Sequence, residues 1–180
     1  MRGTAAPLLI AASLLGILWH PHSSPADENS EVRKNSFDKQ LIGSWKITEC
    51  IDDGKDLLKI DAQHSEDPLE KKLEKFKQAD MKDAILRVVF IFEENTWRTV
   101  RDGETQDEMT IATNTTKSPA TLDVIRQVKE GQEKYLWIYK FANDKLILVG
   151  ASEKSGRPTS FESKPGSKIA KIVLQRTKEK

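Results

Sequence analysis

Two pairs of neighbouring carboxylates are the residues whose types and spacing could do acid–base chemistry. Asp52-Asp53 and Glu93-Glu94 each place two acids side by side in the chain. A catalytic acid needs a carboxyl group whose pKa is raised by burial or by a like charge. Both pairs fall in turn-like segments, where contact with solvent is the default. We therefore expect no raised pKa and no catalytic acid at either pair.

Nucleophilic and metal-based chemistry has few residues available. His64 is the only histidine after residue 26, and it lies in the polar segment DAQHSED. Cys50 is the only cysteine, and near the end of an alternating stretch a small packing residue is a more common role than a nucleophile. A zinc site needs three or four such ligands at characteristic spacing. The sequence predicts no catalytic residue, no metal and no cofactor, and therefore a protein that is not an enzyme.

Aromatic residues form the most informative pattern. The segment KYLWIYKF carries one at every second position, so all of them share one face of a strand. Leu136 and Ile138 make the opposite face apolar as well. One face is therefore expected inside the fold, and the other beneath a helix or a long loop. The aromatic members are Tyr135, Trp137, Tyr139 and Phe141.

The first 26 residues are expected to form a secretory signal peptide. Arg2 precedes an uncharged apolar run from Ala5 to Trp19, and small residues around Ala26 offer a cleavage site. A stretch of this length falls short of the roughly 20 residues that span a bilayer. The predicted protein is exported to the periplasm or the extracellular space, with no stable membrane span after cleavage. Residues 27–39 are polar and predict a flexible leader before a domain over 40–180.

Charge excludes one class of partner. Removal of residues 1–26 takes away one basic residue and no acid, which leaves 28 basic and 28 acidic residues. Nucleic-acid binding needs a basic excess to neutralise phosphates. We therefore expect no nucleic-acid partner.

The remaining pattern predicts an all-β domain. Segments rich in β-branched and aromatic residues alternate with short turns such as EEN, DGET, KEGQ and AND. The segments are 41–51, 84–92, 96–101, 107–113, 120–128, 134–141, 145–152 and 168–176. Short connections require antiparallel neighbours, and about eight such strands close most economically into an up-and-down barrel.

One short amphipathic helix is predicted between the first and second of these strands, over 67–80. Asp67 can cap it and Pro68 fits its first position. Leu69, Leu73 and Phe76 share one face. That face could bind a membrane surface or a partner, or it could pack on the barrel. We favour packing, because the apolar stripe has only three members.

Several of these segments together resemble a known family. LIGSWKITECIDDGK, SPATLDV, YKFANDKLIL, SGRPTSFESKPGS and IVLQR are similar to the small secreted lipocalin-like domain found in many copies in planctomycete bacteria, whose function is uncharacterised. The resemblance covers roughly Leu41 to Arg176. It implies a lipocalin-like barrel in an exported protein, and it implies no activity. Trp137 departs from the pattern where a small residue is usual.

The resemblance also implies how one end of the barrel closes. In lipocalin-like barrels, a basic residue near the last strand covers the tryptophan of the first strand. Arg176 and Trp45 hold the matching positions here, and Gly43 would allow their close approach. A guanidinium over an indole face gains about 0.5–2 kcal/mol. We expect Gly43, Trp45 and Arg176 to have a structural role.

Two functions remain open. The first is the binding of a small apolar or amphipathic ligand inside the barrel, with Trp97, Trp137, Tyr139 and Tyr135 as its contacts. The second is a structural or protein-interaction module whose barrel is filled by side chains, with a partner at the cell surface. The volume left inside the barrel decides between them.

Overall fold

The structure is a computed structural model, and it describes residues 37–59 and 68–177. Side chains are described for these residues except 68–75. The predicted signal peptide and His64 lie outside the described residues, as does the leader up to residue 36.

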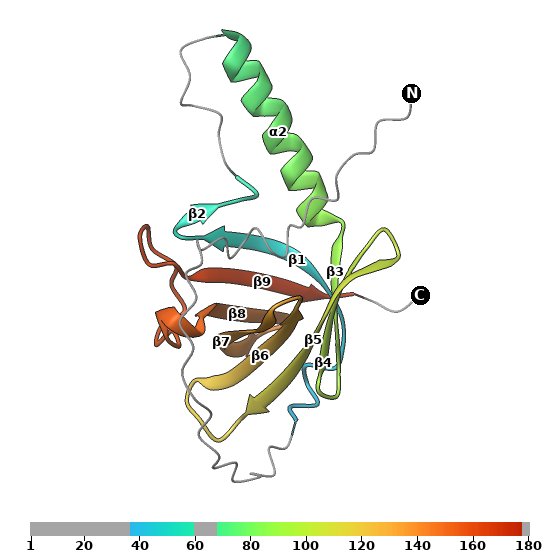
Figure 1. Ribbon diagram of the computed structural model, residues 1–180, viewed down its shortest axis with the longest axis vertical. Coiled ribbons are helices and arrows are strands. Elements are labelled where there is room, and N and C mark those ends of the chain that lie inside the picture. The colour runs from blue at the N-terminus through green and yellow to red at the C-terminus, as the bar shows by residue number, and fades with distance from the viewer. Residues whose placement is uncertain (1–36, 60–67, 178–180) are drawn as a thin grey trace.

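Eight long strands and one helix make up the described fold (Figure 1). A two-residue strand and one turn of 3₁₀ helix complete it. In chain order the elements are β1 (Gly43–Asp52), β2 (Lys55–Asp56), α2 (Pro68–Leu86), β3 (Val88–Glu93), β4 (Thr96–Arg101), β5 (Glu104–Asn114), β6 (Ala120–Val128), β7 (Gly131–Ala142), β8 (Lys145–Ser152), η1 (Glu153–Ser155) and β9 (Ala170–Arg176).

Each long strand pairs antiparallel with its neighbours, and the sheet closes on itself. The order is β1-β3-β4-β5-β6-β7-β8-β9, and β9 returns to pair with β1. Closure leaves no long edge strand exposed, which removes a route to aggregation. The predicted lipocalin-like antiparallel up-and-down barrel is therefore confirmed.

Strand β1 joins the two ends of the sheet. Its first residues, Gly43 to Lys46, pair with β3, whereas nearly its whole length pairs with β9. The register with β9 shifts between Ile47 and Glu49, which marks an irregularity of the bulge type. The far end of β1 pairs instead with the short β2. Near the end that holds Gly43, β1 therefore pairs with strands on both of its sides, and this pairing closes the barrel.

Alternation along the strands fills the barrel with side chains. In β3 and in the second half of β5 every second residue is buried, as the period of two predicts. Aromatic side chains from four strands occupy the interior, and Trp45 packs against Phe141 with ring centroids 6.2 Å apart. The interior is therefore a packed core over most of its length.

The helix differs from the predicted one in length and packing. It has 19 residues and continues six residues past Asp80, because Met81 to Leu86 includes strong helix formers. Strand β3 consequently begins at Val88, so the predicted strand start at Ala84 is wrong. Figure 1 shows α2 extending away from the barrel, and the Phe76 side chain is 60% exposed. The predicted packing of Phe76 on the barrel is also wrong.

The last turns of α2 touch the core. Ile85 is 1% exposed and belongs to the hydrophobic core, and Met81 packs against that core in part. The helix therefore joins the barrel at its C-terminal end.

The barrel's contacts begin before Gln40. The Asp38 backbone N–H donates to Thr113 Oγ1 over 3.0 Å, and Phe37 packs against the core. These residues belong to the segment that the sequence assigned to a flexible leader.

Candidate functional site

The end of the barrel that holds Gly43 is closed by an arginine over a tryptophan. Trp45 and Arg176 are register partners on β1 and β9, and Arg176 Cζ lies 4.2 Å from the centroid of the Trp45 ring. The guanidinium also donates to the carbonyl oxygens of Gln40 and Ile42, over 2.6 Å each. Gly43 has φ +129°, and a Cβ there would lie 2.5 Å from Arg176 Nη1. These three residues therefore meet at one point.

Tyr139 lies apart from the other predicted ligand contacts. It is 2% exposed, and its hydroxyl donates to Asp38 Oδ2 over 2.9 Å. Burial, followed by the hydrogen bond to Asp38, raises its pKa well above the usual range. The Tyr139 hydroxyl is therefore already hydrogen-bonded within the protein, near the closed end of the barrel.

The other three predicted contacts do surround one space. Trp97, Trp137 and Tyr135 line a cavity of about 50 Å³ inside the barrel. The two indole rings meet edge to face, with centroids 5.8 Å apart at 70°. Tyr135 donates its hydroxyl to Glu133 Oε2 over 2.6 Å, at the opposite end of the barrel from Arg176.

The volume of this cavity limits what the barrel can hold. Pockets for drug-sized ligands measure about 300–1,000 Å³, and a benzene molecule occupies an engineered cavity of about 150 Å³. A space of about 50 Å³ accepts no flat or aliphatic ligand of that size. Trp137 is one reason, because its indole occupies the interior opposite Gly150, where a Cβ would overlap the ring.

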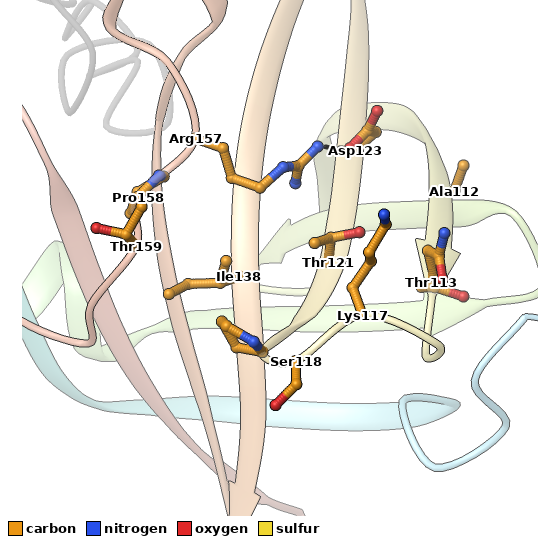
Figure 2. Close-up of a pocket in the computed structure, with 12 residues that line it drawn as sticks. Ala112, Thr113, Lys117, Ser118, Thr121, Asp123, Ile138, Arg157, Pro158 and Thr159 are labelled. Atoms are coloured by element: carbon orange, nitrogen blue, oxygen red, sulfur yellow. Dashed lines mark hydrogen bonds and ion pairs between the residues drawn. The ribbon is translucent and has the colours of Figure 1, made fainter.

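A larger hollow lies on the outer surface. It measures about 600 Å³ and is open to solvent. Its floor is the outward face of β5, β6 and β7, where Ala112, Asp123 and Ile138 lie. The turn between β5 and β6 forms one wall, and the loop after η1 forms the other. We call this hollow the outer groove (Figure 2).

Arg157 fixes the loop wall of the outer groove in place. Its Nη1 donates to the Trp137 carbonyl oxygen over 2.6 Å, and its Nη2 pairs with Asp123. Figure 2 shows the guanidinium reaching across the strands toward Asp123. Ile138 beneath it is 1% exposed. A long loop thus covers the apolar outer face of β7. The sequence predicted that either a helix or a long loop would cover this face.

The outer groove is polar at its rim and carries a positive excess. Lys117 and Arg157 are its cationic residues, and Asp123 is its only carboxylate. Asp123 already pairs with Arg157, whereas Lys117 forms no ion pair with any described residue. Figure 2 shows the Lys117 side chain rising toward the space beside Thr121. Other hydrogen-bonding side chains at the rim are Asn114, Ser118 and Thr159.

One sequence motif points to the outer groove. Gly156 and Pro158 flank Arg157 in SGRP, which predicts a braced arginine in a loop. Its partner Asp123 lies 34 residues earlier, on another strand. Nothing in the spacing of the two residues indicates that they meet.

Asp52 and Asp53 lie in different electrostatic environments. Asp52 has a raised pKa, caused mainly by burial and then by the charge of Asp53, so the prediction of no raised pKa is wrong for this residue. Asp53 has a lowered pKa, because its carboxylate accepts backbone hydrogen bonds, first of all from Lys168. Neither carboxylate lines the cavity or the outer groove.

Cys50 is a buried thiol. It is 1% exposed, and burial, followed by the charges of Asp52 and Asp56, raises its pKa to about 12. A nucleophilic cysteine needs the opposite shift. Within 37–59 and 68–177, no three residues of the His, Cys, Asp and Glu types come together as metal ligands would.

Comparisons of the chain with protein families, with curated proteins and with solved structures find no match. In the part of the chain that the structure describes, none of the helices combines the length and the apolar character that a membrane crossing requires.

Proposed function

We propose that the protein is an exported, non-enzymatic lipocalin-like interaction module, related to the planctomycete secreted domain. Its partner is a protein at the cell surface, which inserts an extended acidic segment into the outer groove. The observation that carries this proposal is the contrast in volume between the two spaces. The outer groove, at about 600 Å³, falls in the range of ligand pockets, whereas the barrel interior retains about 50 Å³.

Charge supports an acidic segment as the occupant. The groove has two cationic side chains against one carboxylate, and the Lys117 ammonium has no described partner. A carboxylate placed beside Lys117 would complete an ion pair at the rim. Such rim charges contribute more to specificity and association rate than to affinity.

Rigidity supports a preformed site. Arg157 ties the loop to the Trp137 carbonyl and to Asp123, so the loop wall is set before any partner arrives. A preformed groove costs less ordering on binding than a mobile one. Hydroxyl and amide groups at the rim can bond the backbone of an extended segment.

A charge series of short peptides tests the proposal. The probes are labelled hexapeptides with a common Gly/Ser frame that carry Glu, Gln or Lys at the same two positions. We expect the Glu peptide to bind most tightly in fluorescence polarisation, and its affinity to fall with salt. Lys117→Glu should weaken it about tenfold, because a partly screened attraction becomes a repulsion. Lys129→Glu, in the exposed turn between β6 and β7, makes the same charge change outside the groove.

A second variant tests the location. Ala112→Trp places an indole in the groove, and we expect it to abolish binding of the Glu peptide. Thr110→Trp is its control, because Thr110 is exposed on the same face of β5 but does not line the groove. Equal binding of the three peptides, or equal effects of Ala112→Trp and Thr110→Trp, would contradict the proposal.

A further inference from the structure

The chain enters the barrel beside the outer groove. The Asp38 backbone N–H donates to Thr113 Oγ1 over 3.0 Å, and Thr113 lines the groove (Figure 2). Two further bonds hold Asp38 in place. Its carboxylate accepts from the Tyr139 hydroxyl over 2.9 Å, and its carbonyl oxygen accepts from the Leu41 N–H over 3.0 Å. The segment that precedes Phe37 therefore starts from a fixed point next to the groove.

The acids of that segment lie at the end that is farther from the barrel. Residues 27–31 read DENSE and carry three carboxylates. The basic residues Arg33 and Lys34 follow them, nearer to Asp38. With cleavage after Ala26, as the sequence predicts, the three acids fall within the first five residues of the mature chain.

The length of the connection allows these acids to reach the groove. Glu31 precedes Asp38 by seven residues, and an extended chain spans at most about 3.3–3.6 Å per residue, which gives about 23–25 Å. Lys117 follows Thr113 by four residues, so the two lie within about 14 Å of each other. A carboxylate of residues 27–31 can therefore meet Lys117 while Asp38 stays in place.

Charge identifies this segment as an occupant of the groove. Arg157 already pairs with Asp123, whereas Lys117 forms no ion pair with a described residue. We propose that residues 27–31 lie in the outer groove beside Lys117 and compete there with the acidic segment of a partner. This inference rests on the proposed preference of the groove for acidic segments, and it adds an internal competitor that a partner must displace.

The tether makes a weak contact sufficient. A short flexible connection gives an effective concentration in the millimolar range. A segment with a Kd of about 0.5 mM, held at about 1 mM, fills the groove about two-thirds of the time. It then weakens the binding of an added peptide about threefold.

A spin label tests where residues 27–31 lie, in the chain that begins at Asp27. Ser30→Cys carries the nitroxide, and the burial of Cys50 directs the label to residue 30. We expect the amide NMR signals of Lys117 and Thr159, on the two walls of the groove, to broaden. The signal of Lys129, in the turn between β6 and β7, should stay sharp.

A neutral variant of the segment tests the role of charge. Asp27→Asn, Glu28→Gln and Glu31→Gln together should remove the broadening at Lys117. The same variant without the label should bind the Glu hexapeptide about threefold more tightly than the unaltered chain, because the groove is no longer occupied. The matched control neutralises three exposed carboxylates that do not line the groove, and it should change neither measurement. Its substitutions are Glu94→Gln, Glu104→Gln and Glu130→Gln.

The outcomes separate this inference from the proposed function. Equal broadening at Lys117 and Lys129, or broadening and peptide affinity that the neutral variant leaves unchanged, would overturn the inference. If the proposed function fails instead, neither the unaltered chain nor the neutral variant prefers the Glu hexapeptide over the Gln and Lys peptides. The label at residue 30 then still broadens the Lys117 signal, because docking within the chain does not depend on an external partner.

Discussion

At the scale of single residues, the contact between Trp45 and Arg176 joins the first and last long strands. The indole is 2% exposed, and its N–H is satisfied by the Leu41 carbonyl oxygen. Arg176 covers its face and bonds two carbonyl oxygens in the segment before β1. One ring thus contributes apolar burial, a cation–π contact and an anchor for the chain entering the barrel.

Loss of that ring should destabilise the whole barrel. Trp45→Ala leaves a cavity in a packed interior and removes the support of Arg176, so we expect a loss of about 3–5 kcal/mol in the free energy of unfolding. Thermal and denaturant unfolding followed by circular dichroism measure it. Lys46→Ala, at the next and exposed position of β1, should change the stability by less than about 0.5 kcal/mol. An unchanged melting temperature for Trp45→Ala would refute the structural role.

A site residue could be predicted when the alternation of its own strand places it. It could not be predicted when its position depends on a contact with a distant segment. Trp97, Trp137 and Tyr135 lie on strands whose alternation shows which face turns inward, and all three line one cavity. Tyr139 follows the same alternation, but Asp38 binds its hydroxyl and strand periodicity carries no information about that partner. The outer groove escaped prediction because Asp123 and Arg157 meet only through the path of a long loop.

At the scale of elements, the strands were the most predictable part. Turn residues clearly flank β4, β6 and β8, so the predicted ranges of these strands equal the observed ones. The two-residue β2 was missed, because its pairing with β1 depends on chain geometry rather than on side-chain pattern. The helix end was missed because Ala84 to Leu86 suits both a helix and a strand, and no glycine or proline separates α2 from β3.

The projecting helix gives a prediction of its own. Phe76 is 60% exposed and Ile85 is 1% exposed, although both are apolar residues of α2. Ile85→Ala should cost about 2–4 kcal/mol of unfolding free energy, because it opens a cavity in the core. Phe76→Ser should cost less than about 0.5 kcal/mol by the same denaturant measurement. Equal losses for the two variants would mean that Phe76 packs on the barrel after all.

At the scale of the whole molecule, the barrel must be stable without a disulfide. The chain has one cysteine, Cys50. It lies on β1, which pairs with β9, and its side chain is buried in the core. An exported protein meets oxidising conditions, in which an accessible thiol would form intermolecular disulfides. Burial of Cys50 prevents this, because only the thiolate reacts and its pKa is raised to about 12. The lone cysteine is therefore compatible with export only while the barrel stays closed.

Export and closure can be measured on the same sample. We expect protein collected from the periplasm or the medium to begin at Asp27, and to remain unlabelled after iodoacetamide treatment at pH 8. The same treatment in denaturant should add one carbamidomethyl group, because the unfolded thiol has its ordinary pKa near 9. The pKa of the Cys50 thiol is about 9 in the unfolded chain and about 12 in the folded chain, so the unfolded chain loses the thiol proton at a lower pH. The contribution of Cys50 to stability should therefore fall as the pH rises from about 9 to 12. An intact mass that retains residues 1–26 would contradict export with cleavage. Labelling of the folded protein would show instead that the barrel opens around β1.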